Sequence, residues 1–253
     1  MCHKMTLPII VGHRANTLRT INRYLKAGVK VLEVDVQRRS GDGLVLIHGP
    51  TPIKPASIFE SILMEMDYVL FSGDPFLRPI PLEIALLIIN GKADVWLDVK
   101  DKGIEKDIVK LLDKINFKGH VYITSCYHAI IRNIKSLRPD IIGGVTLKEL
   151  PVDIVSVAKL ANADMISVEL SYVDRDLVNY AHKHGLKVAV WTVNDVKLAK
   201  KFAEMGVDMI VSDKPIAILK ALRESTTNYK KTSSYPVFFA SLTLNELMMT
   251  SLI

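Results

Sequence analysis

Residues 9–48 read IIVGHRANTLRTINRYLKAGVKVLEVDVQRRSGDGLVLIH and set the pattern that the rest of the chain repeats. The apolar run Leu7–Gly12 precedes a segment, 16–27, in which apolar residues recur at helical spacing, and Gly28 ends that segment. A second apolar run follows at 30–36, with a short one at 44–47. The stretch therefore predicts a strand, a helix and a second strand of a parallel sheet.

The same alternation continues outward from this stretch almost to the end of the chain. Strands are expected to begin at Leu7, Lys30, Asp94, Val121, Ile141, Met165, Lys187 and Met209. Helices are expected at 16–27, 81–89, 104–115, 128–137, 152–160, 175–184, 196–204 and 215–223. Eight βα units predict a single-domain (β/α)8 TIM barrel, of the α/β class, over residues 1–223.

The alternative fold is a doubly wound sheet. Such a sheet normally has fewer strands and a glycine-rich phosphate turn after the first one, where this chain reads GHRAN. The barrel is therefore preferred. A short irregular insertion after the second strand, 50–79, interrupts it, with one helix expected at 57–66.

The tail, 224–253, does not follow the repeat. Residues 224–235 are polar and predict a linker, whereas residues 236–253 are apolar enough for a short helix. Three roles for that helix are open: docking against the barrel, contact with a second subunit of a homo-oligomer, and contact with a membrane surface. The membrane is the less favoured one, because 236–253 contains Glu246 but no Lys or Arg for anionic lipid.

Composition excludes several classes of protein. The chain has 253 residues, a hydrophobic fraction of 49% and a net charge of +6, which suits a globular protein with anionic ligands. Its two cysteines give neither a disulfide framework nor a zinc site. Basic runs interleaved with aromatics are missing, so no nucleic-acid partner is expected. With no signal peptide and no transmembrane segment expected, the predicted location is cytoplasmic.

Polar side chains gather where the expected strands end. His13 and Arg14 follow the first strand, Glu33 and Asp35 lie late in the second, and His48 follows the short run 44–47. Three more residues lie at later strand ends: Asp98, Lys100 and Trp191. Because strands of a barrel end at one rim, these side chains are expected to converge there. The other histidines, such as His128 and His182, are interpreted as surface residues.

The alternating pair Glu33 and Asp35 predicts a divalent metal. Burying two like carboxylates is costly because each loses hydration and repels the other, and a divalent cation removes both costs. Hard oxygen ligands favour Mg²⁺ or Ca²⁺. The alternative is a buried salt bridge from Glu33 or Asp35 to Arg14 or Lys100.

Seven motifs in order resemble those of the glycerophosphodiester phosphodiesterase (GDPD) family, whose fold is a TIM barrel, over residues 8 to about 221. They are His13-Arg14-Ala15 for the family's His-Arg-Gly, Glu33-Val34-Asp35 for its Glu-x-Asp, His48 for its second histidine, IPLEIAL at 80–86 for its Ile-Pro-x-Leu-Glu, WLDVK at 96–100 for its Glu-x-Lys, VAVWTVND at 188–195 for its tryptophan strand and GVDMIVSDKP at 206–215 for its closing strand.

The chain also departs from that family at four places. Ala15 replaces a glycine, which matters if the turn needs a positive φ there. Asp98 replaces the glutamate that joins Glu33 and Asp35 as a metal ligand in the family, and it is one methylene shorter. Gly49 replaces the aspartate after the second histidine, and the Arg-Thr-Thr-Gly-like stretch of many members is missing.

The resemblance implies metal-dependent hydrolysis of small glycerophosphodiesters to glycerol 3-phosphate and an alcohol. His13 and His48 would share the acid and base roles, and Glu33, Asp35 and Asp98 would hold one Mg²⁺ or Ca²⁺. Arg14 and Lys100 would bind the phosphate, and Trp191 would form an apolar wall.

Two alternatives stay open. The first is a lysophospholipase D or phospholipid lyase that releases a cyclic phosphate, with an apolar groove built from Ile58, Phe59, Met64, Tyr68 and Phe71. The second is a barrel that binds phosphorylated ligands without catalysis.

Overall fold

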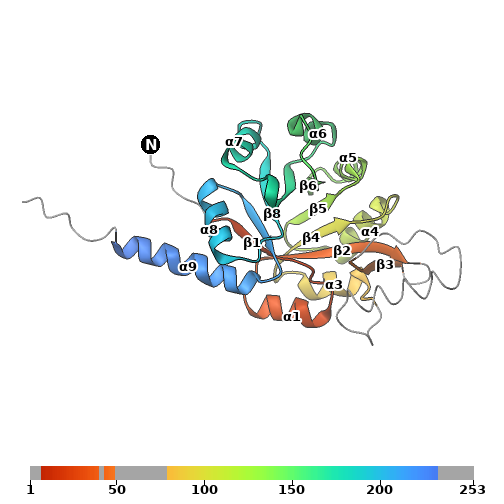
Figure 1. Cartoon of the computed structure of the whole chain (residues 1–253). Coiled ribbons are helices and arrows are strands. Elements are labelled where there is room, and N and C mark those ends of the chain that lie inside the picture. Colours follow the sequence, from red (N-terminus) through yellow and green to blue (C-terminus); the bar gives the residue numbers. More distant parts are fainter. Residues whose placement is uncertain (1–6, 40–42, 49–78, 233–253) are drawn as a thin grey trace, which may run out of the picture.

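In the computed structural model, residues 7–39, 43–48 and 79–232 are described, and they form a closed barrel of strands ringed by helices (Figure 1). The strands are β1 (Ile9–Gly12), β2 (Val31–Arg39), β3 (Gly43–Leu46), β4 (Asp94–Val99), β5 (Val121–Ser125), β6 (Ile142–Leu147), β7 (Met165–Glu169), β8 (Lys187–Trp191) and β9 (Met209–Ser212).

The pairing of the strands closes the barrel. The order in the sheet is β1-β9-β8-β7-β6-β5-β4-β2-β3, and β1 also pairs with β2. All these pairings are parallel except the one between β2 and β3, which is antiparallel. Strand β3 pairs only with β2 and is not one of the strands that close the barrel. Eight parallel strands therefore make up the barrel, as predicted. Because β1 contacts both β2 and β9, a doubly wound open sheet is excluded.

Helices cover the outer face of the strands. They are α1 (Leu18–Lys26), α3 (Leu82–Ile89), α4 (Glu105–Ile115), α5 (His128–Leu137), α6 (Ile154–Leu160), η1 (Leu170–Tyr172), α7 (Arg175–Lys183), α8 (Val196–Met205) and α9 (Pro215–Thr232). Side-chain caps fix where several of them begin. Asp153, Asp174 and Asp195 each accept a hydrogen bond from the backbone N–H three residues on, which satisfies one free donor of the first turn.

Two expectations about helix ends are corrected by the structure. The sixth helix starts at Ile154 rather than Val152, because Asp153 caps it. Helix α9 does not end at Arg223 but continues to Thr232, and in Figure 1 it projects beyond the barrel. Residues 224–232, expected to begin a linker, are therefore helical, which fits their lack of Gly and Pro. The division into a barrel at 1–223 and a tail at 224–253 stays a prediction.

Several sequence-based predictions fall on residues outside the described part. These are the helix expected at 57–66, the apolar groove of the insertion and the apolar helix expected at 236–253. Among the described helices, none is both long and apolar enough to cross a membrane.

The core has two parts, separated by the sheet. The larger part lies between the strands and the helices. The smaller part consists of alternate strand residues, which share the inner face of the barrel because successive side chains point to opposite faces: Val11, Val31, Trp96, Tyr122, Met165, Ala189, Met209 and Val211. This apolar layer fills the interior, so the polar residues that come next along each strand lie at its mouth.

Candidate active site

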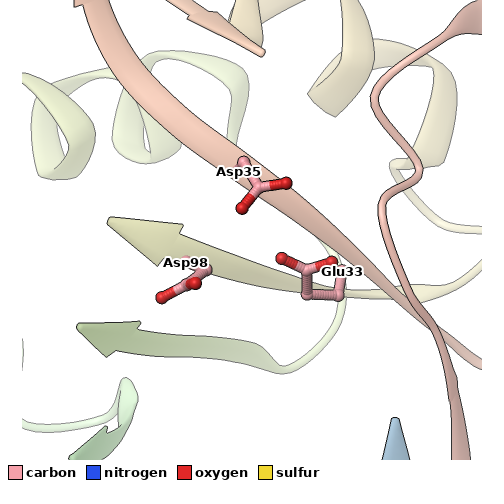
Figure 2. A group of neighbouring side chains, drawn as sticks. All are labelled: Glu33, Asp35 and Asp98. Atoms are coloured by element: carbon pink, nitrogen blue, oxygen red, sulfur yellow. The ribbon is translucent and has the colours of Figure 1, made fainter. Parts of the chain in front are cut away.

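Three carboxylates meet at the C-terminal mouth of the barrel. Glu33 and Asp35 follow Val31 at alternate positions of β2, so both project to its inner face. Asp98, on β4, is the register partner of Asp35. One oxygen from each of the three lies within 4.8 Å of the others, and Figure 2 shows the side chains grouped across the two strands. The predicted convergence of these residues is confirmed.

Lys100 places a cation beside two of these carboxylates. Its ammonium donates to Asp35 Oδ1 at 2.9 Å and also bonds Asp98 Oδ2. Burial favours the neutral amine, but the negative charges of Asp98 and Asp35 outweigh it and raise the pKa of Lys100. The salt bridge considered as the alternative to a metal is thus present for Asp35, through Lys100.

Asp35 is the most heavily bonded of the three. Its Oδ2 accepts from Asn16 Nδ2 at 2.7 Å and lies 3.1 Å from His48 Nδ1, while its backbone N–H donates to Asn16 Oδ1 at 2.9 Å. Burial alone favours the neutral acid, yet the His48 hydrogen bond and the Lys100 charge lower the pKa of Asp35 well below its usual range. Asp35 is therefore ionised, and its orientation is fixed.

Glu33 is the carboxylate whose ionised form its surroundings stabilise least. It is 3% exposed, and burial, followed by repulsion from Asp35 and Asp98, raises the pKa of Glu33 well above its ordinary value. Its Oε2 accepts the Arg14 backbone N–H at 2.6 Å, and His13 Nε2 lies 3.9 Å away. A divalent cation among these oxygens would stabilise the ionised form. The donor set fits a hard, oxygen-bound ion such as Mg²⁺ or Ca²⁺.

The two histidines lie on either side of this cluster, and each is held through Nδ1 by a carboxylate. His48 Nδ1 lies against Asp35, as described above. His13 Nδ1 lies 2.7 Å from Asp213 Oδ1, in the loop after β9. The Nδ1 contact of His13 leaves its Nε2 on the side of Glu33, 3.9 Å from Oε2.

Asp213 is in turn held by the loop after β8. Its Oδ2 accepts from Asn194 Nδ2 at 2.7 Å, and its backbone N–H donates to Asn194 Oδ1 at 2.9 Å. The hydrogen bond with His13, followed by that with Asn194, lowers the pKa of Asp213 to about 2. The carboxylate is thus ionised whenever His13 is bonded to it.

Arg14 and Trp191 also lie at the mouth. Arg14 has φ 51°, in the left-handed region, which directs its N–H at Glu33 while its side chain is exposed. The positive φ therefore falls on Arg14, and Ala15 is fully buried without one, so the loss of the family's glycine leaves the turn intact. Trp191 is half-buried, and its Nε1 is a buried donor without a partner among the described residues.

Four polar residues that sequence reasoning did not select complete the site. They are Asn16, Thr124, Asn194 and Asp213. Thr124 Oγ1 accepts from Trp96 Nε1 at 2.7 Å and donates to Asp98 Oδ1 at 3.2 Å. Asn194 and Asp213 belong to the two motifs 188–195 and 206–215, so their position just after strand ends was the available signal.

Comparisons with known proteins point to one family. The model of the glycerophosphoryl diester phosphodiesterase family matches residues 83–217. A glycerophosphodiester phosphodiesterase from Caldanaerobacter subterraneus subsp. tengcongensis is 24% identical over 240 residues, which cover 85% of this chain and 98% of the relative.

Solved structures show the same fold. One is a phosphodiesterase from Oleispira antarctica in complex with the product sn-glycerol-3-phosphate, with a TM-score of 0.72 and 22% identity over 86% of this chain and 97% of that one. Another is a glycerophosphodiester phosphodiesterase from Parabacteroides distasonis, with a TM-score of 0.71 and 18% identity over 87% of this chain and 98% of that one.

Proposed function

The chain belongs to the glycerophosphoryl diester phosphodiesterase family, and from that premise we propose that it hydrolyses small glycerophosphodiesters to glycerol 3-phosphate and an alcohol. It is, in this proposal, a metal-dependent phosphoric diester hydrolase. The observation that carries the proposal is the placement of His13 and His48 on either side of the Glu33, Asp35 and Asp98 carboxylates.

The general acid and general base roles are assigned to the two histidines, His13 and His48. Hydrolysis forms a bond from the attacking oxygen to phosphorus and breaks the bond from phosphorus to the alcohol oxygen. One imidazole takes the proton of the attacking water, and the other gives a proton to the departing alkoxide, so charge and protons balance. Imidazole suits both roles because it titrates near neutral pH.

Binding of the phosphodiester is assigned to the cations of the mouth. Lys100 presents its ammonium beside the carboxylates, and the exposed guanidinium of Arg14 is able to form paired hydrogen bonds to phosphate oxygens. Trp191 provides an aromatic wall for the substrate. Glu33, Asp35 and Asp98 would hold one Mg²⁺ or Ca²⁺, which supplies Lewis-acid polarisation of a phosphoryl oxygen.

One experiment tests the proposal against both alternatives. The purified protein is incubated with glycerophosphocholine or a lysophospholipid, with and without Mg²⁺ or Ca²⁺, and the products are followed by phosphorus NMR. We expect glycerol 3-phosphate to accumulate only when metal is present. A stable cyclic phosphate as the end product, or cleavage confined to lysophospholipids, would instead support the lyase or lysophospholipase D. Binding without turnover of any phosphodiester would support the non-catalytic barrel.

A further inference from the structure

His13 and Asp213 form a hydrogen-bonded pair across the seam where the barrel closes. His13 follows β1 and Asp213 follows β9, which are adjacent strands, and Nδ1 lies 2.7 Å from Oδ1. An ionised carboxylate only accepts hydrogen bonds, so Nδ1 must carry the proton. The neutral His13 ring is therefore fixed with Nε2 as its acceptor, and Nε2 lies on the side of Glu33, 3.9 Å from Oε2.

Neighbouring residues bond both the side chain of Asp213 and the backbone of His13 and Asp213. Asn194 bonds both the side chain and the backbone of Asp213, at 2.7 Å and 2.9 Å, and Ser212 Oγ donates to Asn194 Oδ1 at 3.1 Å. The Tyr24 hydroxyl donates to the backbone oxygens of His13 and Asp213, at 3.3 Å and 3.4 Å. Three loops of the mouth thus converge on one imidazole.

We propose that Asp213, braced by Asn194, is a positioning residue that sets the tautomer and orientation of His13 for proton transfer at Nε2. The inference rests on the proposed function, because it takes His13 as one of the two acid–base groups. The inference also distinguishes the two histidines. His48 contacts Asp35, a member of the acidic cluster that Lys100 and Asn16 also bond. His13 contacts Asp213, a carboxylate outside that cluster.

The position of Asp213 argues against a purely structural role. Its side chain is 41% exposed, and an exposed ion pair contributes little to stability. His13, by contrast, is only 13% exposed and faces the cluster. Another His–Asp pair serves as a matched control: Asp208, just before β9 at the opposite end of the barrel, lies 2.8 Å from His182 Nε2.

The test is a double-mutant cycle on hydrolysis of glycerophosphocholine. Asp213→Asn keeps the shape of the side chain but removes the charge that fixes the ring, so kcat should fall by about 10–100-fold. The KM, the metal concentration for half-maximal activity and the melting temperature should not change. Asn194→Ala should lower kcat in the same direction by less, and Asp208→Asn should leave it unchanged.

In a His13→Ala background, Asp213→Asn should cost nothing more, because the group through which it acts is missing. Full additivity of the two losses, or an unchanged kcat in Asp213→Asn alone, would overturn the inference while wild-type turnover still supported the proposed function. Nitrogen NMR of the His13 ring needs no turnover: the protonated Nδ1 should be present in the wild type and lost or shared with Nε2 in Asp213→Asn. The same tautomer mixture in both proteins would also overturn it.

Discussion

The Lys100 ammonium donates to Asp35 at 2.9 Å, which places a cation of the chain itself against one of the three proposed metal ligands. Lys100 bonds Asp98 as well, so it neutralises one of three negative charges. Its charge also lowers the pKa of Glu33, but burial and repulsion from Asp35 and Asp98 outweigh that effect. The cluster thus combines a fixed cation for the phosphate with enough remaining charge for a divalent ion. The two readings of this cluster, salt bridge and metal site, are compatible.

Removal of that cation should damage catalysis without weakening the metal site. Lys100→Met takes away the charge beside the phosphate, so kcat/KM should fall by about 10²–10³-fold. The metal concentration for half-maximal activity should not rise, because the cluster becomes more negative. Steady-state kinetics over a metal titration measures both. Lys102→Met, at the exposed lysine beside Tyr127, is the control; a raised metal requirement in Lys100→Met would contradict the prediction.

Asp98 should behave as a metal ligand despite being shorter than the family's glutamate. EDTA should abolish activity, and Mg²⁺ or Ca²⁺ should restore it. In Asp98→Asn the metal concentration needed should rise by at least about 10-fold, because a charged ligand is lost. Asp107→Asn, which alters an exposed carboxylate paired with Arg38, should leave the requirement as it is. If both variants need the same metal concentration, Asp98 is not a ligand.

The barrel could be predicted from the sequence because the strand–helix pattern is repeated along the chain. Apolar runs alternate with helical segments along the chain, and a single misjudged element, such as the end of α9 at Thr232, leaves the closure of the sheet unaffected. The carboxylate cluster was predictable for a similar local reason. Glu33 and Asp35 lie two apart inside one strand, so alternation alone puts them on one face.

The supporting residues were not predictable in the same way. Asp213 lies 200 positions from His13, and only the pairing of β1 with β9 brings them together. Asn16 and Asn194 stand in loops where asparagine is common for local reasons, such as turns. Their hydrogen bonds to Asp35 and Asp213 depend on the direction of each side chain, and hydrophobic periodicity does not predict that direction.

The second histidine should be as essential as the first. His48→Ala should lower turnover by about 10²–10⁴-fold, because one of the two proton-transfer groups is lost, while the barrel keeps its melting temperature. His128→Ala is the control, since His128 also lies at the mouth but contacts only the backbone oxygen of Thr146 in the hydrogen bonds described, at 3.2 Å. Near-normal turnover in His48→Ala would remove this histidine from the mechanism.

Glu33 should make the stability of the metal-free protein depend on pH. The ordinary pKa of a glutamate is 4.5, and that of Glu33 is raised well above it in the folded state. The folded chain therefore binds more protons than the unfolded chain in the window above pH 4.5, and stability must fall as pH rises through that window. Below pH 4.5 Glu33 is protonated in both the folded and the unfolded state, so burying its charge no longer lowers stability.

Glu33→Gln removes the buried charge and keeps an oxygen for the Arg14 N–H. In metal-free protein its melting temperature should exceed that of the wild type at about pH 8, and the difference should shrink toward about pH 5. Added Mg²⁺ or Ca²⁺ should raise the melting temperature of the wild type more than that of the variant, because binding to the folded state alone stabilises it. Glu105→Gln, at a buried glutamate bonded to Asn133 on the outer helices, should keep the full metal response. A wild type that is more stable than Glu33→Gln at high pH without metal would show that other groups already balance the Glu33 charge.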